Sequence, residues 1–397
     1  MKKFIYTIAS LLILASACTS QDDIYKEFIV EGGHVYPAKP VNVQTVSGFQ
    51  RVIIKWEKPK DPSVVSSRLF WNNKADSAEV AYSAEGKASY TVTGLEDRSY
   101  AFYVVNFDKN GNRSLDVEVT ANPYGSSWLV SHSERSVMGF SRGDSTILAF
   151  SKATYEMVQT RVVYMNLSGK LVEYPEVLPA DKDTIILKDA MKGKKIFYKS
   201  AYRPEGGTDM VENTSWTKSA QGLLYDLDVS KWTVKATEGQ VQGTNTPDKI
   251  FDGITNLASG RYVSSNAAAY REVFPKILSI DTHSDPGKEP TVLQMTFYQH
   301  PVDGSYRFIR DVSIFIGDVE YNPDTADYAA EYSGFVLKRT FSTTQITQSM
   351  SMNAHGRYMA FVFTNSYNTS LQFIDLWEVV PYGFIEGDSD VPYPDFK

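Results

Sequence analysis

One short motif in the chain has the residue types of a catalytic nucleophile. Residues 139–143 spell G-F-S-R-G, a G-x-S-x-G pattern in which hydrolases expose a serine hydroxyl on a strained turn. That chemistry needs a strand before Ser141 and a helix after it. Residues 144–150 instead alternate as a strand does, so we predict a hairpin turn here. An esterase that uses Ser141 is kept as a third alternative.

The histidines form no pattern that binds a metal or a phosphate. The sequence contains neither an H-E-x-x-H motif nor a glycine-rich phosphate loop. A carboxylate pair for glycoside hydrolysis stays open, because such a pair is defined by its separation in space. We nevertheless predict a protein that is not an enzyme and has no catalytic residues. The histidines are His34, His132, His283, His300 and His355.

The single cysteine, Cys18, ends a short apolar run that follows two lysines at the start of the chain. Small residues at 15–17 stand before it, and the run is shorter than the roughly 20 apolar residues of a membrane span. This pattern is typical of a bacterial lipoprotein signal. It predicts a signal peptide over 1–17 and a lipidated tether over 18–37, with lipid as the only membrane anchor. An ordinary signal peptide with an incidental cysteine is the alternative.

Composition limits the class of protein further. The 397 residues are enough for two or three domains, and with one cysteine the chain cannot be a small disulfide scaffold. The net charge of -7 argues against nucleic acid as a partner, because such binders carry a basic surface. Aromatic residues make up 13% of the chain, which is compatible with a sugar ligand but is more simply typical of a chain rich in β-strands.

Residues 38–123 alternate apolar and polar side chains between turn residues, which predicts a β-sandwich. Thr93, Gly94 and Leu95, with Tyr100 five residues after the leucine, resemble the corner of a fibronectin type III domain. The resemblance implies that the Tyr100 hydroxyl bonds back to the chain, that Leu95 fills the core, and that Trp56 is the core tryptophan. Residues 124–222 repeat this pattern less clearly and predict a second fibronectin-like sandwich.

Residues 225–383 contain strands separated by long loops, and four stretches resemble the discoidin family, also called the coagulation factor five/eight C-type family. They are W-T-V at 232–234, I-F-D-G at 250–253, R-Y-M at 357–359 and the strand at 377–383. The resemblance implies a galactose-binding-like jelly-roll sandwich. The fold class expected for the whole chain is therefore all-β, with two fibronectin type III-like sandwiches, this jelly roll and an acidic tail over 384–397.

The discoidin resemblance also implies site residues. Family members often hold a structural Ca²⁺, a hard cation that takes six to eight oxygen ligands, and Asp252, Asn256 and Glu378 stand at the corresponding places. A plain Asp-Gly turn with Glu378 exposed is the alternative. A sugar site would lie among the loops at one barrel end. The candidate ligand-binding residues are Arg261, Tyr262, Gln299, His300, Tyr306, Arg307, Asn365 and Tyr367.

The whole arrangement resembles a family of Bacteroidota outer-membrane lipoproteins of uncharacterised function. The residues that carry this likeness include K-E-F at 26–28, V-Y-P at 35–37 and L-F-W-N at 69–72, and the acidic residues after Cys18 resemble an export signal to the cell exterior. We therefore expect a surface lipoprotein, lipid-anchored in the outer membrane, that captures a glycan beside an uptake complex. The alternative is an adhesive or structural protein that binds a protein partner.

Overall fold

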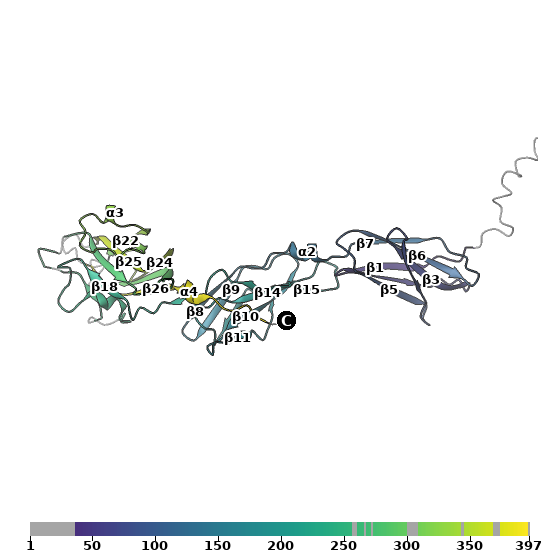
Figure 1. The fold of residues 1–397 in the computed structure, drawn as a ribbon, viewed down its shortest axis with the longest axis horizontal. Coiled ribbons are helices and arrows are strands. Elements are labelled where there is room, and N and C mark those ends of the chain that lie inside the picture. The colour runs from purple at the N-terminus through teal and green to yellow at the C-terminus, as the bar shows by residue number, and fades with distance from the viewer. Residues whose placement is uncertain are drawn as a thin grey trace, which may run out of the picture. The chain divides into compact units, whose positions relative to one another are not determined.

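The structure, a computed structural model, describes residues 36–255, 260–265, 267–270, 273–299, 309–342, 345–367 and 374–395 (Figure 1). Nearly all regular secondary structure in these residues is β-strand, so the predicted all-β class is confirmed. The chain divides into two compact units. The first unit runs to Ser131 and also includes Arg203–Val211, whereas the second comprises His132–Tyr202 and Glu212–Lys397.

The first unit contains a sandwich of two antiparallel sheets, with strand orders β1-β2-β5 and β4-β3-β6-β7 in the described residues. Its only α-helix there is the short α2 (Ser126–Val130). The strands are β1 (Val41–Gly48), β2 (Arg51–Glu57), β3 (Val64–Trp71), β4 (Asp76–Val80), β5 (Lys87–Thr93), β6 (Tyr100–Asp108) and β7 (Val117–Ala121).

The core of this first sandwich follows the alternation in its strands. On β2, Val52, Ile54 and Trp56 are buried, and the Trp56 indole donates a 3.0 Å hydrogen bond to the Ser67 hydroxyl. A buried indole N–H needs such a partner. The Tyr100 hydroxyl accepts a 3.1 Å hydrogen bond from the Glu96 backbone N–H beside the buried Leu95. The corner contact expected from the sequence is therefore present.

The second unit begins with the middle sandwich. One sheet has the order β11-β10-β14-β15, with β12 on β10 and β16 on β14, and the other has the order β13-β9-β8. The strands are β8 (Val137–Arg142), β9 (Ser145–Phe150), β10 (Met157–Met165), β11 (Leu171–Glu173), β12 (Leu178–Pro179), β13 (Thr184–Leu187), β14 (Phe197–Tyr202), β15 (Val211–Glu212) and β16 (Thr217–Lys218).

Ser141 lies on β8, directly across the hairpin from Thr146 on β9. Its side chain is 1% exposed, and its hydroxyl is 2.7 Å from that of Thr146. A strand, not a helix, follows the turn at Gly143, so the hairpin prediction is confirmed. The Ser141 hydroxyl therefore lacks the exposed position that a nucleophile elbow requires.

The C-terminal sandwich completes the second unit. Its sheets have the orders β17-β26-β21-β24, with β19 on β26, and β18-β20-β25-β22-β23. The elements are β17 (Tyr225–Asp226), β18 (Thr233–Ala236), the 3-10 helix η2 (Pro247–Phe251), β19 (Tyr262–Val263), β20 (Lys276–Asp281), β21 (Pro290–Gln299), β22 (Ile309–Gly317), α3 (Tyr328–Glu331), β23 (Phe335–Thr340), β24 (Thr347–His355), β25 (Tyr358–Ser366), β26 (Asp375–Ile385) and α4 (Glu386–Ser389).

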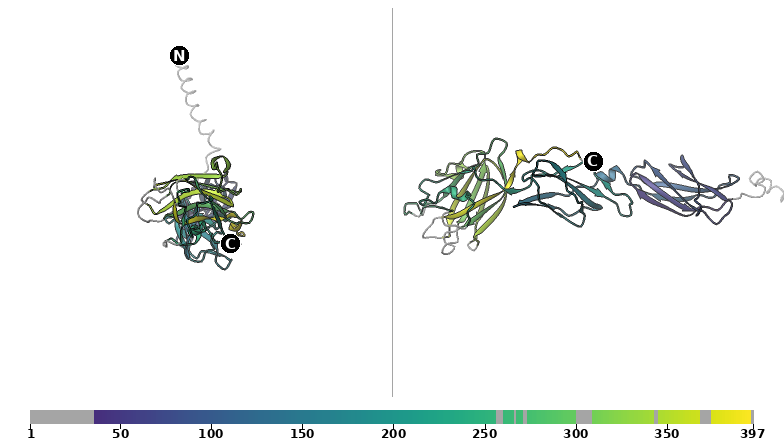
Figure 2. Two further views of the ribbon diagram at one scale, coloured as in Figure 1. Left: turned by 90° about the vertical axis from the view of Figure 1, so that its left-hand side faces the viewer. Right: turned by 90° about the horizontal axis from the view of Figure 1, so that it is seen from below.

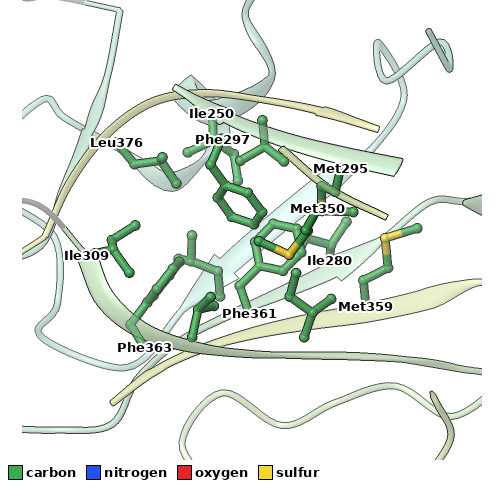
Figure 3. Packing of buried hydrophobic residues seen from close by; sticks show 14 of the residues in the cluster. Ile250, Ile280, Met295, Phe297, Ile309, Met350, Met359, Phe361, Phe363 and Leu376 are labelled. Atoms are coloured by element: carbon green, nitrogen blue, oxygen red, sulfur yellow. The ribbon is translucent and has the colours of Figure 1, made fainter. Parts of the chain in front are cut away.

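Buried apolar side chains from both sheets pack between them, with Phe297, Phe361 and Met350 near the centre of the view (Figure 3). Phe297 and Phe361 meet edge to face, with ring centroids 5.3 Å apart. Burial of such large side chains contributes about 1.5–3 kcal/mol each, so this core is a rigid support for the loops at the ends of the sandwich.

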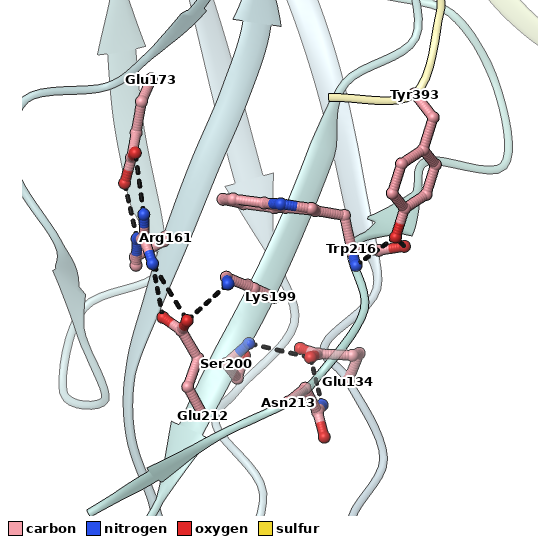
Figure 4. A network of polar contacts seen from close by, with 9 residues as sticks. All are labelled: Glu134, Arg161, Glu173, Lys199, Ser200, Glu212, Asn213, Trp216 and Tyr393. Carbon is pink, nitrogen blue, oxygen red and sulfur yellow. Dashed lines mark hydrogen bonds and ion pairs between the residues drawn. The ribbon is translucent and has the colours of Figure 1, made fainter. Parts of the chain in front are cut away.

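The C-terminal segment returns from the last sandwich to the middle one, as Figure 2 shows in yellow beside teal. Val391 is buried against Phe197 and Trp216, and the Tyr393 hydroxyl accepts a 2.6 Å hydrogen bond from the Trp216 backbone N–H (Figure 4). Lys218 pairs with Asp390 at 2.7 Å. Residues 390–393 of the predicted acidic tail therefore pack against the middle sandwich, whereas its first two residues, Phe384 and Ile385, still belong to β26.

Beneath this segment the middle sandwich contains an ion-pair network (Figure 4). Arg161 donates to both carboxylate oxygens of Glu173, at 2.6 and 2.9 Å, and also pairs with Glu212 at 3.0 Å. Lys199 reaches the same Glu212 carboxylate at 2.5 Å. The Arg161 guanidinium holds the pKa of Glu173 below its usual range. Each charge in the network has an opposite partner, so we assign it a structural role.

Candidate functional site

Strand ends bring several of the predicted site residues to one end of the C-terminal sandwich. Gln299 ends β21 opposite Leu376, near the start of β26, and Tyr262 of β19 also pairs with Leu376. On the other sheet, Ile309 at the start of β22 pairs with Ser366 at the end of β25. Arg261, Asn365 and Tyr367 are next to these positions. Five other predicted residues lie outside the described residues: Cys18, Asn256, His300, Tyr306 and Arg307.

The strongest polar contact at this end is an ion pair between Arg261 and Asp375. Arg261 Nη1 lies 2.9 Å from Asp375 Oδ2, the Asp375 side chain is 0% exposed, and the Arg261 side chain is 16% exposed. Burying a carboxylate is costly unless it is paired, so Asp375 needs Arg261. Asp375 thereby orients a guanidinium that keeps a partial contact with solvent. Sequence reasoning missed Asp375, although a charged residue at the start of a largely apolar strand was a usable signal.

Gln299 is fully buried and lies next to this ion pair, because it is opposite Leu376, the residue that follows Asp375 on β26. Its side-chain Oε1 accepts a 2.7 Å hydrogen bond from the backbone N–H of Ile309. Its Nε2, like Nε of Arg261, is buried without a hydrogen-bond partner. Leaving a buried donor unpaired costs about 1–3 kcal/mol, which makes both groups candidates for a function beyond stability.

The remaining predicted ligand residues differ in exposure. Tyr262 is 1% exposed, and its hydroxyl donates a 2.7 Å hydrogen bond to the Gln240 carbonyl. Burial raises its pKa, and protein atoms cover its ring, so the expected sugar platform at Tyr262 is corrected to a core residue. Tyr367 is half-buried, and its hydroxyl donates to the Phe341 carbonyl at 2.5 Å. Asn365 is also half-buried, on β25.

The predicted metal ligands Asp252 and Glu378 meet at the Asp-Gly turn after η2. Glu378 Oε2 accepts a 2.8 Å hydrogen bond from the Gly253 N–H, and Asp252 Oδ1 accepts a 2.9 Å bond from the Ile254 N–H. Gly253 has φ +77°, a conformation that glycine adopts without steric cost. Glu378 is 3% exposed, so the alternative of an exposed Glu378 is wrong.

Burial raises the pKa of Glu378 to about 8, and the nearby charge of Asp252 acts in the same direction. A cation between the two carboxylates would reverse this effect, because it would favour the ionised form of both. These two side chains fit part of a Ca²⁺ site, while further oxygens would have to come from carbonyls or water. Within the described ranges no cluster of three or more His, Cys, Asp or Glu is present, and Asn256 lies outside them.

The described residues also bear on membrane attachment. Among them, no helix has the length and apolar character needed to cross a bilayer. The predicted anchor at Cys18 falls outside this part of the chain and stays a prediction.

Comparison with known proteins gives one family match. The model of DUF4998, a family described as a domain of unknown function, matches residues 18–209. No curated protein matches the chain. The matched range ends at Asp209, inside the segment Arg203–Val211 that belongs to the first unit.

Several solved structures are similar to parts of the chain. A family 32 carbohydrate-binding module from C. perfringens NanJ, in complex with galactose, is 15% identical, with a TM-score of 0.31; it covers 40% of this chain and 99% of its own. A SusE-like protein is 11% identical over 86% of this chain and 96% of its own, with a TM-score of 0.30. The family 32 module of Streptococcus pneumoniae EndoD is 13% identical, covers 39% and 98%, and has a TM-score of 0.30. Because these TM-scores are low, the similarities assign no ligand to this chain.

Proposed function

We propose that this chain is a non-catalytic surface lipoprotein whose C-terminal sandwich binds a glycan. The observation that carries the proposal is the oriented guanidinium of Arg261, held by buried Asp375 at the end of the sandwich that also contains Gln299. A buried ion pair adds little net stability, so positioning the guanidinium is a better explanation for its presence. Its Nη1 donates to Asp375, and its Nε is buried without a hydrogen-bond partner.

The polar and aromatic side chains at this end of the C-terminal sandwich are of the types that bind a saccharide. A sugar presents hydroxyl groups that accept hydrogen bonds from a guanidinium or an amide, together with an apolar face that packs on an aromatic ring. Arg261, whose side chain is 16% exposed, supplies donors, and the half-buried ring of Tyr367 replaces Tyr262 as the candidate aromatic surface, while buried Gln299 supports the start of β22 through Ile309. Ligand sites commonly combine a rigid apolar scaffold with a few placed polar groups.

The biological role follows from the anchor. A lipid on Cys18 would hold the protein in the outer membrane, facing the cell exterior, and many copies on one surface would strengthen weak glycan binding through effective concentration. Capture of glycans beside an uptake complex fits such a display. We also propose that Ca²⁺ binds at Asp252 and Glu378, where it would order the turn that precedes Arg261.

Titration calorimetry of the soluble chain from Asp22 onward against a glycan panel tests the proposal. Tyr367→Ala should weaken binding at least about tenfold, or 1.4 kcal/mol, because it removes the aromatic surface. The matched control is Tyr155→Ala, since Tyr155 is 73% exposed in the middle sandwich. Equal binding by both variants would contradict the proposed site. The adhesive alternative would be favoured if no glycan gives a measurable heat of binding and a cross-linking pull-down from intact cells recovers one stoichiometric protein partner.

A further inference from the structure

The first unit contains an open cleft of about 700 Å³, far from the site described above in the sequence. The cleft is lined by the end of β1, the turn before β6, the segment around Tyr124, helix α2 and residues 204–207. Every lining residue belongs to the first unit and to the described residues. Its volume falls within the range of about 300–1,000 Å³ that small-molecule sites occupy.

One wall of the cleft is held by a dense set of hydrogen bonds to Asp209. Arg51 donates two of them, from Nε at 2.9 Å and Nη2 at 2.6 Å, and the Phe49 N–H donates a third at 2.7 Å. The Arg51 guanidinium lowers the pKa of Asp209, so this carboxylate stays ionised. Bidentate hydrogen bonds between arginine and a carboxylate are strong and directional. These bonds anchor Asp209, two residues after the 204–207 segment that lines the cleft.

The Tyr124 hydroxyl adds two further bonds to the same wall. It accepts from the Asp209 backbone N–H at 2.8 Å and donates to the Asp209 carbonyl at 2.9 Å. Its ring also meets the Trp128 indole edge to face, with centroids 4.9 Å apart. One tyrosine thus links the 203–211 segment to helix α2, on which Trp128 lies.

The lining of the cleft also contains an indole and charged groups. The Trp128 backbone N–H donates a 2.9 Å hydrogen bond to Asp97 Oδ2, and the Trp128 side chain is half-buried. The Arg98 guanidinium lies over the Tyr100 ring at 4.2 Å and remains 59% exposed. The cleft therefore combines an aromatic surface with hydrogen-bond donors and acceptors.

From this geometry we infer that the cleft is a second ligand site, which binds a short neutral oligosaccharide. Sugar hydroxyls both donate and accept, so they can use the Asp97 and Glu205 carboxylates and the Arg98 guanidinium, while the C–H face of a ring packs on Trp128. The two carboxylates outnumber the single guanidinium, so the negative charge of the lining disfavours binding of a polyanionic ligand. A wall that is already ordered lowers the entropic cost of binding.

The experiment uses the soluble chain from Asp22 onward and five probes: maltotriose, cellotriose, xylotriose, mannotriose and β-1,4-galactotriose. Titration calorimetry should find binding by at least one probe, with Trp128→Ala weakening it at least tenfold. Val130→Ala is the matched control, because Val130 is on the same helix, is 83% exposed and does not line the cleft. It should leave the affinity unchanged.

Glu205→Gln provides a second test that does not depend on the helix. Glu205 is exposed, and this variant should weaken binding; its melting temperature is compared with that of the wild type to check that the fold is kept. Tyr367→Ala separates the two proposals, since it should affect only binding at the C-terminal sandwich. No binding of any probe below about 1 mM, or unchanged affinity in both Trp128→Ala and Glu205→Gln, would overturn the second site.

Discussion

Replacing Glu378 by Gln should change how the stability of the second unit depends on pH. In the folded protein, burial beside Asp252 raises the pKa of Glu378 to about 8, whereas an unfolded glutamate ionises near pH 4.3. Between these values the folded state holds a proton that the unfolded state has released. The contribution to the free energy of unfolding is therefore full below about pH 4.3 and is lost as the pH rises to about 8.

The size of the effect follows from the pKa difference. One pKa unit corresponds to about 1.4 kcal/mol, so the loss between pH 5 and pH 8 is about 4 kcal/mol as an upper limit. Glu378→Gln has no ionisable group, and its amide oxygen can still accept the hydrogen bond from Gly253. The variant should therefore gain stability relative to the wild type by up to this amount over the same interval.

Scanning calorimetry of the soluble chain with a chelator, at pH 5, 6, 7 and 8, measures this difference. Other titrating groups are common to both proteins and cancel in the comparison. Asp252→Asn is a second variant, because removing the neighbouring charge should lower the pKa of Glu378 and reduce the pH dependence. Parallel stability curves for wild type and Glu378→Gln would refute the argument that Glu378 is protonated in the folded state.

Calcium should stabilise the protein at the pH at which ionisation of Glu378 destabilises it. At pH 8, Ca²⁺ at a hundredfold excess over its Kd should stabilise the wild type by about 2.7 kcal/mol, provided that it binds only the native state. Glu378→Gln should lose most of this gain. A melting temperature of the wild type that responds to neither Ca²⁺ nor chelator would exclude a stabilising calcium site.

Three further substitutions test the anchor, the tail and the first core. Cys18→Ala should move the protein from the membrane fraction to the soluble fraction on cell fractionation, and retention in the membrane would contradict lipid anchoring. Val391→Ala should lower the free energy of unfolding by about 1–3 kcal/mol in urea, because it removes buried contacts with Trp216; an unchanged midpoint would mean that the tail does not pack in solution. Trp56→Ala should cost about 3–5 kcal/mol, with exposed Val65→Ala as a control near zero.

Local patterns in the sequence predicted the strands and their buried faces. Trp56 was predicted in the core and is 1% exposed, and it shares the buried face of β2 with Val52 and Ile54 because the side-chain period of a strand is two regardless of its partners. The Leu95–Tyr100 corner and the hairpin at Ser141 were also predictable, since each involves residues close together in the chain. Such features depend on backbone geometry that a few neighbouring residues determine.

Only the tertiary structure decided which of the candidate side chains are buried and which are paired. Arg261 and Asp375 are 114 residues apart in the sequence, and Arg51 and Asp209 are 158 apart, so no local pattern connects either pair. Tyr262 had the residue type of a sugar platform, yet pairing of β19 with β26 turned it into the core. The packing of Val391 depends in the same way on a surface built by distant strands. Burial is a property of the assembled sheets, and it decides whether an aromatic ring or a charge binds a ligand or supports the fold.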